Sequence, residues 1–294
     1  MRLLGIGDNV VDCYADEGMM FPGGNAVNVA VYAQRAGVES AYMGVVGSDP
    51  AGHLVIESLQ NEGVDVERVR IAPGANAYAI VQVTNGERHF LASDDGVSVL
   101  ELGEAELAAL GDFDIVHTAS TGSLSDQVAD MARYAKVSYD FSRERDPLYI
   151  EKIARHLAFA TFSAGDLDVV QTERLLRTTH ELGSEIVVAT RGAKGSLIFD
   201  GKKVWRQEAT PVRVVDSLGA GDAYVAGIIV GVLGGKSISE AMMQGAAFAA
   251  QVCTTRGAFG HASSLNAIPG AKAYGGQASS PGHMEGVDAR GVSK

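Results

Sequence analysis

Short runs of apolar and β-branched residues alternate along this chain with longer stretches whose apolar positions recur with a helical period. The short runs predict buried strands, and the longer stretches predict amphipathic helices. The predicted strands cover residues 3–7, 41–47, 114–118, 136–141, 158–162 and 185–190, and the predicted helices cover residues 25–37, 48–63, 125–135, 147–157 and 168–182. This alternation is typical of an α/β fold with a mainly parallel sheet covered on both faces by helices.

Residues 78–92 interrupt this alternation. Two runs of alternating apolar and polar residues flank Asn85-Gly86, a pair that is typical of a tight type I′ hairpin turn. We expect an antiparallel pair of strands here, inserted into a parallel architecture. Two interpretations stay open, because the hairpin could form a small β lid that projects from the main sheet or an ordinary edge of that sheet.

The composition is that of one globular domain followed by a polar tail. The chain has 294 residues, of which 46% are hydrophobic and 20% charged, and this is enough to bury one large α/β core. After Pro269 the chain becomes rich in Gly, Ser and Ala and poor in apolar residues. We therefore expect a domain over residues 1–265 and, over residues 266–294, a tail that is disordered or derived from an expression vector.

Charge and the length of apolar runs exclude several classes of partner. The net charge of -12 and the lack of any Lys/Arg cluster argue against binding to DNA or RNA. The longest apolar run, residues 223–233, is shorter than the ~20 residues that span a membrane. Cys13 and Cys253 form neither a disulfide framework nor a zinc motif, and the chain starts with a predicted strand rather than a signal peptide. A soluble cytoplasmic protein is expected, and its singly placed histidines are interpreted as packed or surface residues.

The sequence SLGAGD, residues 217–222, places small residues directly before an apolar stretch that predicts a helix. Gly219, Ala220 and Gly221 leave room for backbone N–H groups to converge at the helix N-terminus, where they suit an anion such as a phosphate. Asp222 either caps this helix or accepts a proton from a hydroxyl that attacks the phosphate. The helix dipole is expected to lower the pKa of Asp222 and make it a weak base, which phosphoryl transfer tolerates.

Small and polar residues also gather near the amino end of the chain. Gly23 and Gly24 open a predicted helix, and Asn25 and Asn28 project from one face of its first turn. Their carboxamides either bind the hydroxyls of a polyol or cap the helix.

Acidic residues follow the first predicted strand, at the end of an α/β sheet where ligands collect. Together with the amide of Asn9, the carboxylates of Asp8 and Asp12 could hold sugar hydroxyls there. Gly5 and Gly7 begin a sequence like a dinucleotide-binding motif, but Val10 stands where its third glycine should be. We therefore reject an oxidoreductase of the Rossmann type.

A glycine-rich turn joins two strands that are predicted within residues 187–201. Thr190 offers a hydroxyl there and Lys194 a cation, while Gly192 and Gly195 allow close approach of the backbone, a set that suits a nucleotide. A plain hairpin is the simpler interpretation of this stretch taken alone.

Taken together, these motifs resemble the PfkB (ribokinase-like) family of carbohydrate kinases over residues 1–260. DSLGAGD at 216–222 is similar to the family's C-terminal signature, and GGNAVNVA at 23–30 is similar to its N-terminal one. Both signatures in this order form a specific combination. The resemblance implies a three-layer α/β sandwich with a mainly parallel central sheet and a small β lid, at about residues 13–22 and 76–93. It also implies the ATP-dependent phosphorylation of a sugar hydroxyl.

The resemblance further implies a role for each motif residue. Asp222 would be the catalytic base, and the amides of Gly219, Ala220 and Gly221 would hold the phosphate. The sugar would be bound by Asp12, Gly23, Gly24, Asn25 and Asn28, with Asp8 beside them, and the nucleotide by Ser163, Thr190, Gly192, Lys194 and Gly195. Asp216 would lie near a site for a monovalent cation such as K⁺, together with the segment around Gly257.

One motif departs from the family pattern. Where relatives carry Asn-x-x-Glu, which helps to organise Mg²⁺ and phosphates, this chain has Ser163-Ala164-Gly165-Asp166. Asp166 keeps a carboxylate that is one methylene shorter, so its expected role toward Mg²⁺ is an outer one, through water. The expected cofactors are ATP and Mg²⁺, with K⁺ as a further candidate.

Within the family, the chain most resembles fructoselysine 6-kinases and related fructosamine kinases, on GDNVVD (7–12), FPGGNAVNVAVY (21–32), GERHF (86–90) and WRQ (205–207). The short lid segment between Asp12 and Gly23 would leave room for a substituent on the sugar. Arg88 either reaches an anionic part of this substituent or faces solvent.

The expected reaction converts a ketose or ketose-amine, such as fructoselysine, to its 6-phosphate. The alternatives are a kinase for another sugar or nucleoside (fructose, ribose or adenosine) and a non-catalytic sugar or nucleotide sensor on the same fold. Exposed lid strands further predict a homodimer formed through the lid.

Overall fold

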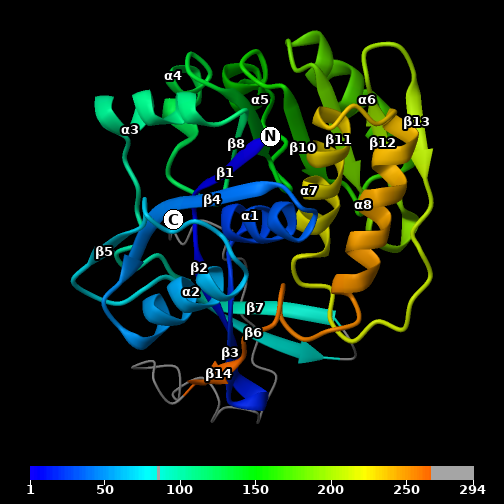
Figure 1. Ribbon diagram of the computed structural model, residues 1–294. Coiled ribbons are helices and arrows are strands. Elements are labelled where there is room, and N and C mark those ends of the chain that lie inside the picture. Colours follow the sequence, from blue (N-terminus) through cyan, green and yellow to red (C-terminus); the bar gives the residue numbers. More distant parts are fainter. Residues whose placement is uncertain (85–86, 266–294) are drawn as a thin grey trace.

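A nine-stranded sheet forms the centre of the structure, a computed structural model that describes residues 1–84 and 87–265, with the backbone alone for 83–84 and 87–90 (Figure 1). Its strand order is β13-β12-β11-β10-β9-β8-β1-β4-β5. All neighbouring pairs are parallel except the pairs that β12 makes with β11 and β13 at one edge. The strands are β1 (Arg2–Gly7), β4 (Glu39–Gly47), β5 (Arg70–Ala72), β8 (Ile115–Ala119), β9 (Lys136–Asp140), β10 (Phe159–Ser163), β11 (Ile186–Thr190), β12 (Ser196–Phe199) and β13 (Val204–Gln207).

Helices cover both faces of this sheet and make the predicted three-layer α/β sandwich. They are α1 (Asn25–Arg35), α2 (Pro50–Asn61), α3 (Glu104–Ala109), α4 (Val128–Met131), α5 (Pro147–Ala154), α6 (Val169–Glu181), α7 (Ala220–Leu233) and α8 (Ile238–Val252). One hydrophobic core holds buried residues of α1, α2, α7 and α8, and a second holds those of α4, α5 and α6. Strand β1 serves both, because Leu3 packs into the first core and Leu4 into the second. The helix predicted over 125–135 is shorter, since only four of its residues form α4.

A second, five-stranded sheet has the order β14-β3-β2-β6-β7 and lies below the main sheet in Figure 1. Its strands are β2 (Val10–Tyr14), β3 (Met19–Gly23), β6 (Tyr78–Thr84), β7 (Glu87–Asp94) and β14 (Ser263–Ser264). The segments predicted for the lid thus form a separate small sheet rather than an edge of the main one. The turn residues Asn85 and Gly86 lie outside the described residues, and so does the predicted tail over 266–294. Pairing of two lids in a homodimer stays a prediction.

Two glycines place helix α1 directly against strand β1. A Cβ on Gly5 would lie 2.1 Å from the Ala26 carbonyl oxygen, so the helix approaches the strand more closely than any side chain would allow. Gly24, the residue before α1, has a φ of +106°, and a Cβ there would lie 2.7 Å from the Cα of Asn9. These approaches bring the first turn of α1 to the carboxyl end of β1.

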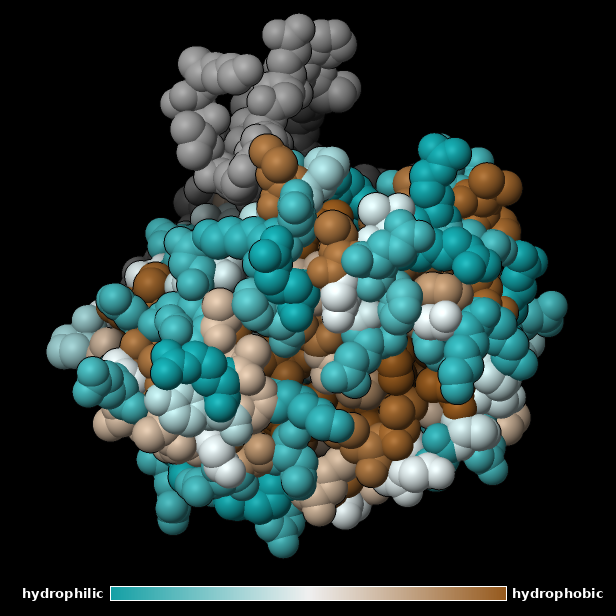
Figure 2. Space-filling model, turned by 90° about the horizontal axis from the view of Figure 1, so that it is seen from above, coloured by the Kyte–Doolittle hydropathy of each residue, from teal (hydrophilic) through white to brown (hydrophobic). Residues whose placement is uncertain are grey.

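The surface is largely hydrophilic in the view from above, with small apolar groups between the polar ones (Figure 2). Over the two described ranges of the chain, none of the helices combines the length and the apolar character that crossing a membrane requires.

Candidate active site

The N-termini of α1 and α7 meet at the carboxyl ends of the central strands. Asn25 Nδ2 donates to Asp222 Oδ1 at 2.8 Å, and Asn28 Nδ2 donates to Asp222 Oδ2 at 2.6 Å. The two sequence motifs therefore lie in one site, although 194 residues separate Asn28 from Asp222. In this structure the carboxamides that we expect to bind sugar hydroxyls also hold the expected base.

A further carboxylate, Asp140, belongs to this cluster and was not predicted from the sequence. It ends strand β9, and its Oδ2 accepts a hydrogen bond of 2.8 Å from the same Asn25 amide nitrogen that donates to Asp222. The rule that singled out Asp8, that polar residues directly after a buried strand face the ligand end of the sheet, applies equally to Asp140.

Asp8 holds the start of α1. Its carboxylate accepts hydrogen bonds from the backbone N–H groups of Asn25 at 2.8 Å and Ala26 at 3.1 Å, and from the Thr121 hydroxyl at 3.1 Å. Asp12 is buried nearby on the lid strand β2, and a Cβ on Gly23 would lie 2.5 Å from its Oδ2. The predicted sugar-binding residues thus surround one end of α1, except that the side chain of Arg88, on β7, lies outside the described residues.

Burial is the main cause that raises the pKa of Asp222 from its ordinary value to about 8; the negative charges of Asp140, Asp8 and Asp12 act in the same direction, and the hydrogen bond from Asn28 acts against it. The expectation that the helix N-terminus lowers this pKa was therefore wrong. Desolvation and the neighbouring carboxylates outweigh the helix dipole, because a buried charge loses more solvation than a helix end restores. A carboxylate with a raised pKa is a stronger base than an ordinary Asp.

The loop before α7 has the shape that an anion site needs. Gly219 has a φ of +73°, and a Cβ on it would lie 2.6 Å from the Cβ of Ala258, so no other residue fits without strain. A Cβ on Gly221, in contrast, would meet open space. The Ala220 N–H donates to the Ser217 carbonyl at 3.3 Å, a long hydrogen bond.

A small cavity joins this loop to the predicted nucleotide-binding residues. Its lining includes Gly221 and Asp222 from α7, Asp140 from β9, Ser163 from β10 and Thr190 from β11. Gly192 and Gly195 follow in the turn after β11, with φ values of +58° and +78°. Four adjacent strand and helix ends thus contribute to one small space beside Asp222.

Of the residues that replace the family's Asn-x-x-Glu motif, Ser163 lines this cavity. Lys194 Nζ donates to the Gly165 carbonyl at 2.8 Å, and Arg145 Nη2 donates to the Ser163 carbonyl at 2.6 Å. Asp166 is exposed, and its charge acts on the Arg145 guanidinium. Within the described part of the chain, no cluster of three His, Cys, Asp or Glu side chains could hold a metal ion. These residues fit a Mg²⁺ ion held mainly by phosphates and water, as is usual for Mg²⁺.

Asp216 connects the loop before α7 to the lid. Its carboxylate accepts hydrogen bonds from the Tyr14 hydroxyl at 2.6 Å, from the Leu218 N–H at 3.0 Å and from the Gly257 N–H at 3.1 Å. Asp216 thus contacts the segment around Gly257. Donors of this kind do not suit a cation, so a K⁺ site at Asp216 stays a prediction and enters no step below.

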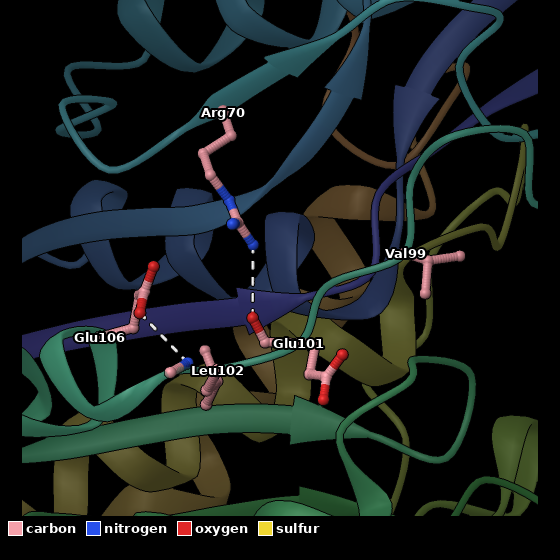
Figure 3. A pocket seen from close by; sticks show the side chains of 6 residues that line it. Arg70, Val99, Glu101, Leu102 and Glu106 are labelled. Carbon is pink, nitrogen blue, oxygen red and sulfur yellow. Dashed lines mark hydrogen bonds between the residues drawn. The ribbon is translucent and has the colours of Figure 1, made fainter.

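A second hollow lies elsewhere, between β5 and the segment before α3 (Figure 3). Arg70 Nη2 donates to the Glu101 carbonyl at 3.4 Å, and Glu106 accepts from the Gly103 N–H at 3.1 Å. The side chains of Arg70 and Glu106 are thus engaged locally, and this hollow contains none of the predicted site residues. The cleft at the start of α7 is the better candidate.

Comparison with known proteins identifies the family. A family model described as pfkB family carbohydrate kinase matches residues 4–263. The chain belongs to the pfkB family of carbohydrate kinases. This kinase is 36% identical to the fructosamine kinase FrlD of Bacillus subtilis, over 89% of this chain and 94% of that relative. It is also 36% identical to a fructoselysine 6-kinase of Escherichia coli, over 86% of this chain and 98% of that relative.

A solved structure agrees with the fold of this pfkB family kinase. The structure of Arabidopsis thaliana ribokinase complexed with ribose and ATP superposes with a TM-score of 0.75 at 19% identity, covering 90% of this chain and 96% of that one. The predicted family, the ribokinase-like fold and the assignment as a carbohydrate kinase are therefore confirmed.

The raised pKa of Asp222 predicts how the activity of this kinase depends on pH. In the expected role of base, Asp222 must be unprotonated to accept a proton, so kcat/KM should rise with pH as Asp222 loses its proton, with an acid limb near a pKa of about 8. Steady-state assays from about pH 4 to above pH 8 measure the acid limb of the pH profile of kcat/KM. A limb at the ordinary Asp value of about 4 would contradict the prediction.

Thermal unfolding gives a control that does not depend on turnover. Because the folded protein favours the protonated carboxyl, Asp222 contributes most to stability at low pH, and this contribution is lost as the pH rises from about 4 to about 8. The melting temperature of the Asp222→Asn variant should therefore fall less over this range than that of the wild type. Parallel curves for the two proteins would show that the pKa of Asp222 is not raised.

Proposed function

We propose that this chain phosphorylates a ketose-amine, such as fructoselysine, on its 6-hydroxyl with ATP as the phosphate donor. The observation that carries the proposal is the junction of the two helix N-termini. There, Asn25 and Asn28 hold the Asp222 carboxylate at the start of α7, next to Gly221. A base thus stands beside an anion-binding helix end, as transfer of a phosphoryl group to a hydroxyl requires.

Asp222 acts as the base in this proposal. Its carboxylate accepts the proton of the sugar hydroxyl as the hydroxyl oxygen bonds to the γ-phosphorus of ATP. The bond from this phosphorus to the β–γ bridging oxygen breaks, and ADP leaves with the electron pair. N–H groups at the start of α7, which have no partner within the helix, stabilise the charge on the transferred group.

The open space at Gly221 and the adjoining cavity support the placement of the phosphates. Ser163 and Thr190 line this cavity, so hydroxyl groups are available to the nucleotide there. Mg²⁺, when bound, supplies charge neutralisation to the phosphates. Asp166 would hold it through water.

The relatives support a ketose-amine as the acceptor. Two relatives at 36% identity are a fructosamine kinase and a fructoselysine 6-kinase, and each is covered over more than nine-tenths of its length. The lid crossing between β2 and β3 is short, since it consists of the single helical turn Ala15–Glu17 and Gly18. A short crossing leaves space for the substituent that a fructosamine carries on its sugar.

An acceptor panel tests the proposed reaction. With ATP and Mg²⁺, ADP release should be fastest with fructoselysine, and kcat/KM should be about 10-fold or more lower for fructose, ribose and adenosine. The Asp222→Asn variant should lose about 100- to 10,000-fold in kcat, because it lacks the base. The control is Asp130→Asn, at an exposed residue in the first turn of α4, which should match the wild type.

The outcomes of this panel separate the alternatives. Higher kcat/KM with another sugar or with adenosine would reassign the acceptor while keeping the reaction. Binding of ATP and sugar without product would favour a sensor. Wild-type kcat in the Asp222→Asn variant would remove the base assignment.

A second substitution tests the phosphate site. In Gly221→Ala the new methyl group meets no atom of the folded protein, so the melting temperature should be unchanged, but it fills space next to the expected phosphates. We expect kcat/KM for ATP to fall about 100-fold or more. Gly111→Ala is the matched control, because its Cβ also meets open space, away from the cleft. Normal kinetics in Gly221→Ala would show that the phosphates bind elsewhere.

A further inference from the structure

His117 is buried in the middle of strand β8, with no exposed surface, directly beneath the first turn of α1. In the register of the main sheet it lies between Gly5 on β1 and Ser138 on β9, so the three residues form a row across adjacent strands. Gly5 has no side chain, and the Ala26 carbonyl of α1 occupies the space where a Cβ would stand. The helix therefore comes close enough for His117 to contact Asn25.

Both ring nitrogens of His117 have polar partners. His117 Nε2 lies 2.6 Å from Asn25 Oδ1, and Nδ1 lies 2.9 Å from Ser138 Oγ. A histidine that only filled space in the core would not need hydrogen-bond partners at both ring nitrogens. His117 is therefore more than the packed residue that is expected from the sequence.

The carboxylates determine the direction of these hydrogen bonds. Asn25 Nδ2 donates to Asp140 and to Asp222, which uses both of its hydrogens, so Asn25 Oδ1 must face the histidine and can only accept. His117 Nε2 must therefore carry the proton, and Nδ1 accepts from the Ser138 hydroxyl. Burial lowers the pKa of His117 to about 3, which keeps the ring neutral with a single proton to donate.

We propose that His117 is a positioning residue for phosphoryl transfer, which fixes the carboxamide of Asn25 so that its nitrogen faces Asp222 and Asp140. This inference rests on the proposed role of Asp222 as the base. Without the donor at position 117, Asn25 Oδ1 loses the hydrogen bond that it accepts from His117 in the described structure. The Asn25 carboxamide can then rotate about its Cβ–Cγ bond. Rotation by half a turn would point its oxygen at two carboxylates, so the residue would instead leave this position and one oxygen of Asp222 would lose its donor.

Substitutions at position 117 separate positioning from simple packing. His117→Leu fills the space but donates nothing, and we expect kcat to fall about 10- to 100-fold with little change in KM for ATP. His117→Gln keeps an amide N–H near the position of Nε2 and should recover most of the lost kcat. Thr118→Val, at the next buried residue of β8, removes a hydroxyl that has no partner in the described structure and should match the wild type.

The pH profile adds a readout that packing alone would not move. In His117→Leu the acid limb of kcat/KM should shift to higher pH, because Asp222 keeps only Asn28 as a donor while Asp8, Asp12 and Asp140 still face it. Loss of kcat in both His117 variants with an unmoved limb would overturn the proposal, as would full activity in His117→Leu.

Nitrogen-15 NMR of the imidazole tests the same claim without turnover, so it stands even if the acceptor or the base is wrongly assigned. The signals of His117, assigned by their absence in His117→Gln, should show a proton on Nε2 and a bare Nδ1 from about pH 6 to pH 9. A proton on Nδ1, or on both nitrogens, would mean that His117 does not donate to Asn25 as the structure requires.

Discussion

Two hydrogen bonds, from the carboxamides of Asn25 and Asn28 to the carboxylate of Asp222, join the start of α1 to the start of α7, and the geometry of the site depends on them. A buried carboxylate is tolerated only where donors replace the water that it loses. Both helices must therefore begin at the same place, although they come from opposite ends of the chain. Close packing at Gly5 fixes one of them, and the left-handed backbone of Gly219 fixes the other.

The site combines an excess of negative charge with two positive helix ends. Burial, together with the charges of Asp140, Asp8 and Asp12, holds the pKa of Asp222 above the ordinary range, which makes it a better base. The N–H groups at the start of α1 stabilise Asp8, and the start of α7 is the helix end proposed to bind the phosphate. The negative charges of these carboxylates repel a phosphate. A nucleotide whose phosphates are partly neutralised by Mg²⁺ therefore suits this cleft better than a bare anion.

Much of the order of helices and strands could be predicted from the sequence, because most inner strands of the main sheet are short apolar runs and because α2, α5 and α6 begin at aspartate caps. The motifs Gly23–Asn28 and Gly219–Asp222 could also be predicted, since glycines directly before a helix leave its N-terminal N–H groups open to a ligand. Contacts between distant strands could not be predicted, and this is why His117 was missed, whereas the rule that singled out Asp8 could also have found Asp140 at the end of β9. The pKa of Asp222 had the wrong expected sign, because its burial depends on α1 rather than on its own helix.

A crystal structure with a non-hydrolysable ATP analogue and fructoselysine tests the central claim most directly. The account predicts that the γ-phosphate lies on the backbone amides of residues 219–221 and that the 6-hydroxyl of the sugar is within hydrogen-bond distance of the Asp222 carboxylate. A γ-phosphate bound away from the start of α7, or a sugar whose hydroxyls do not reach Asp222, would contradict it.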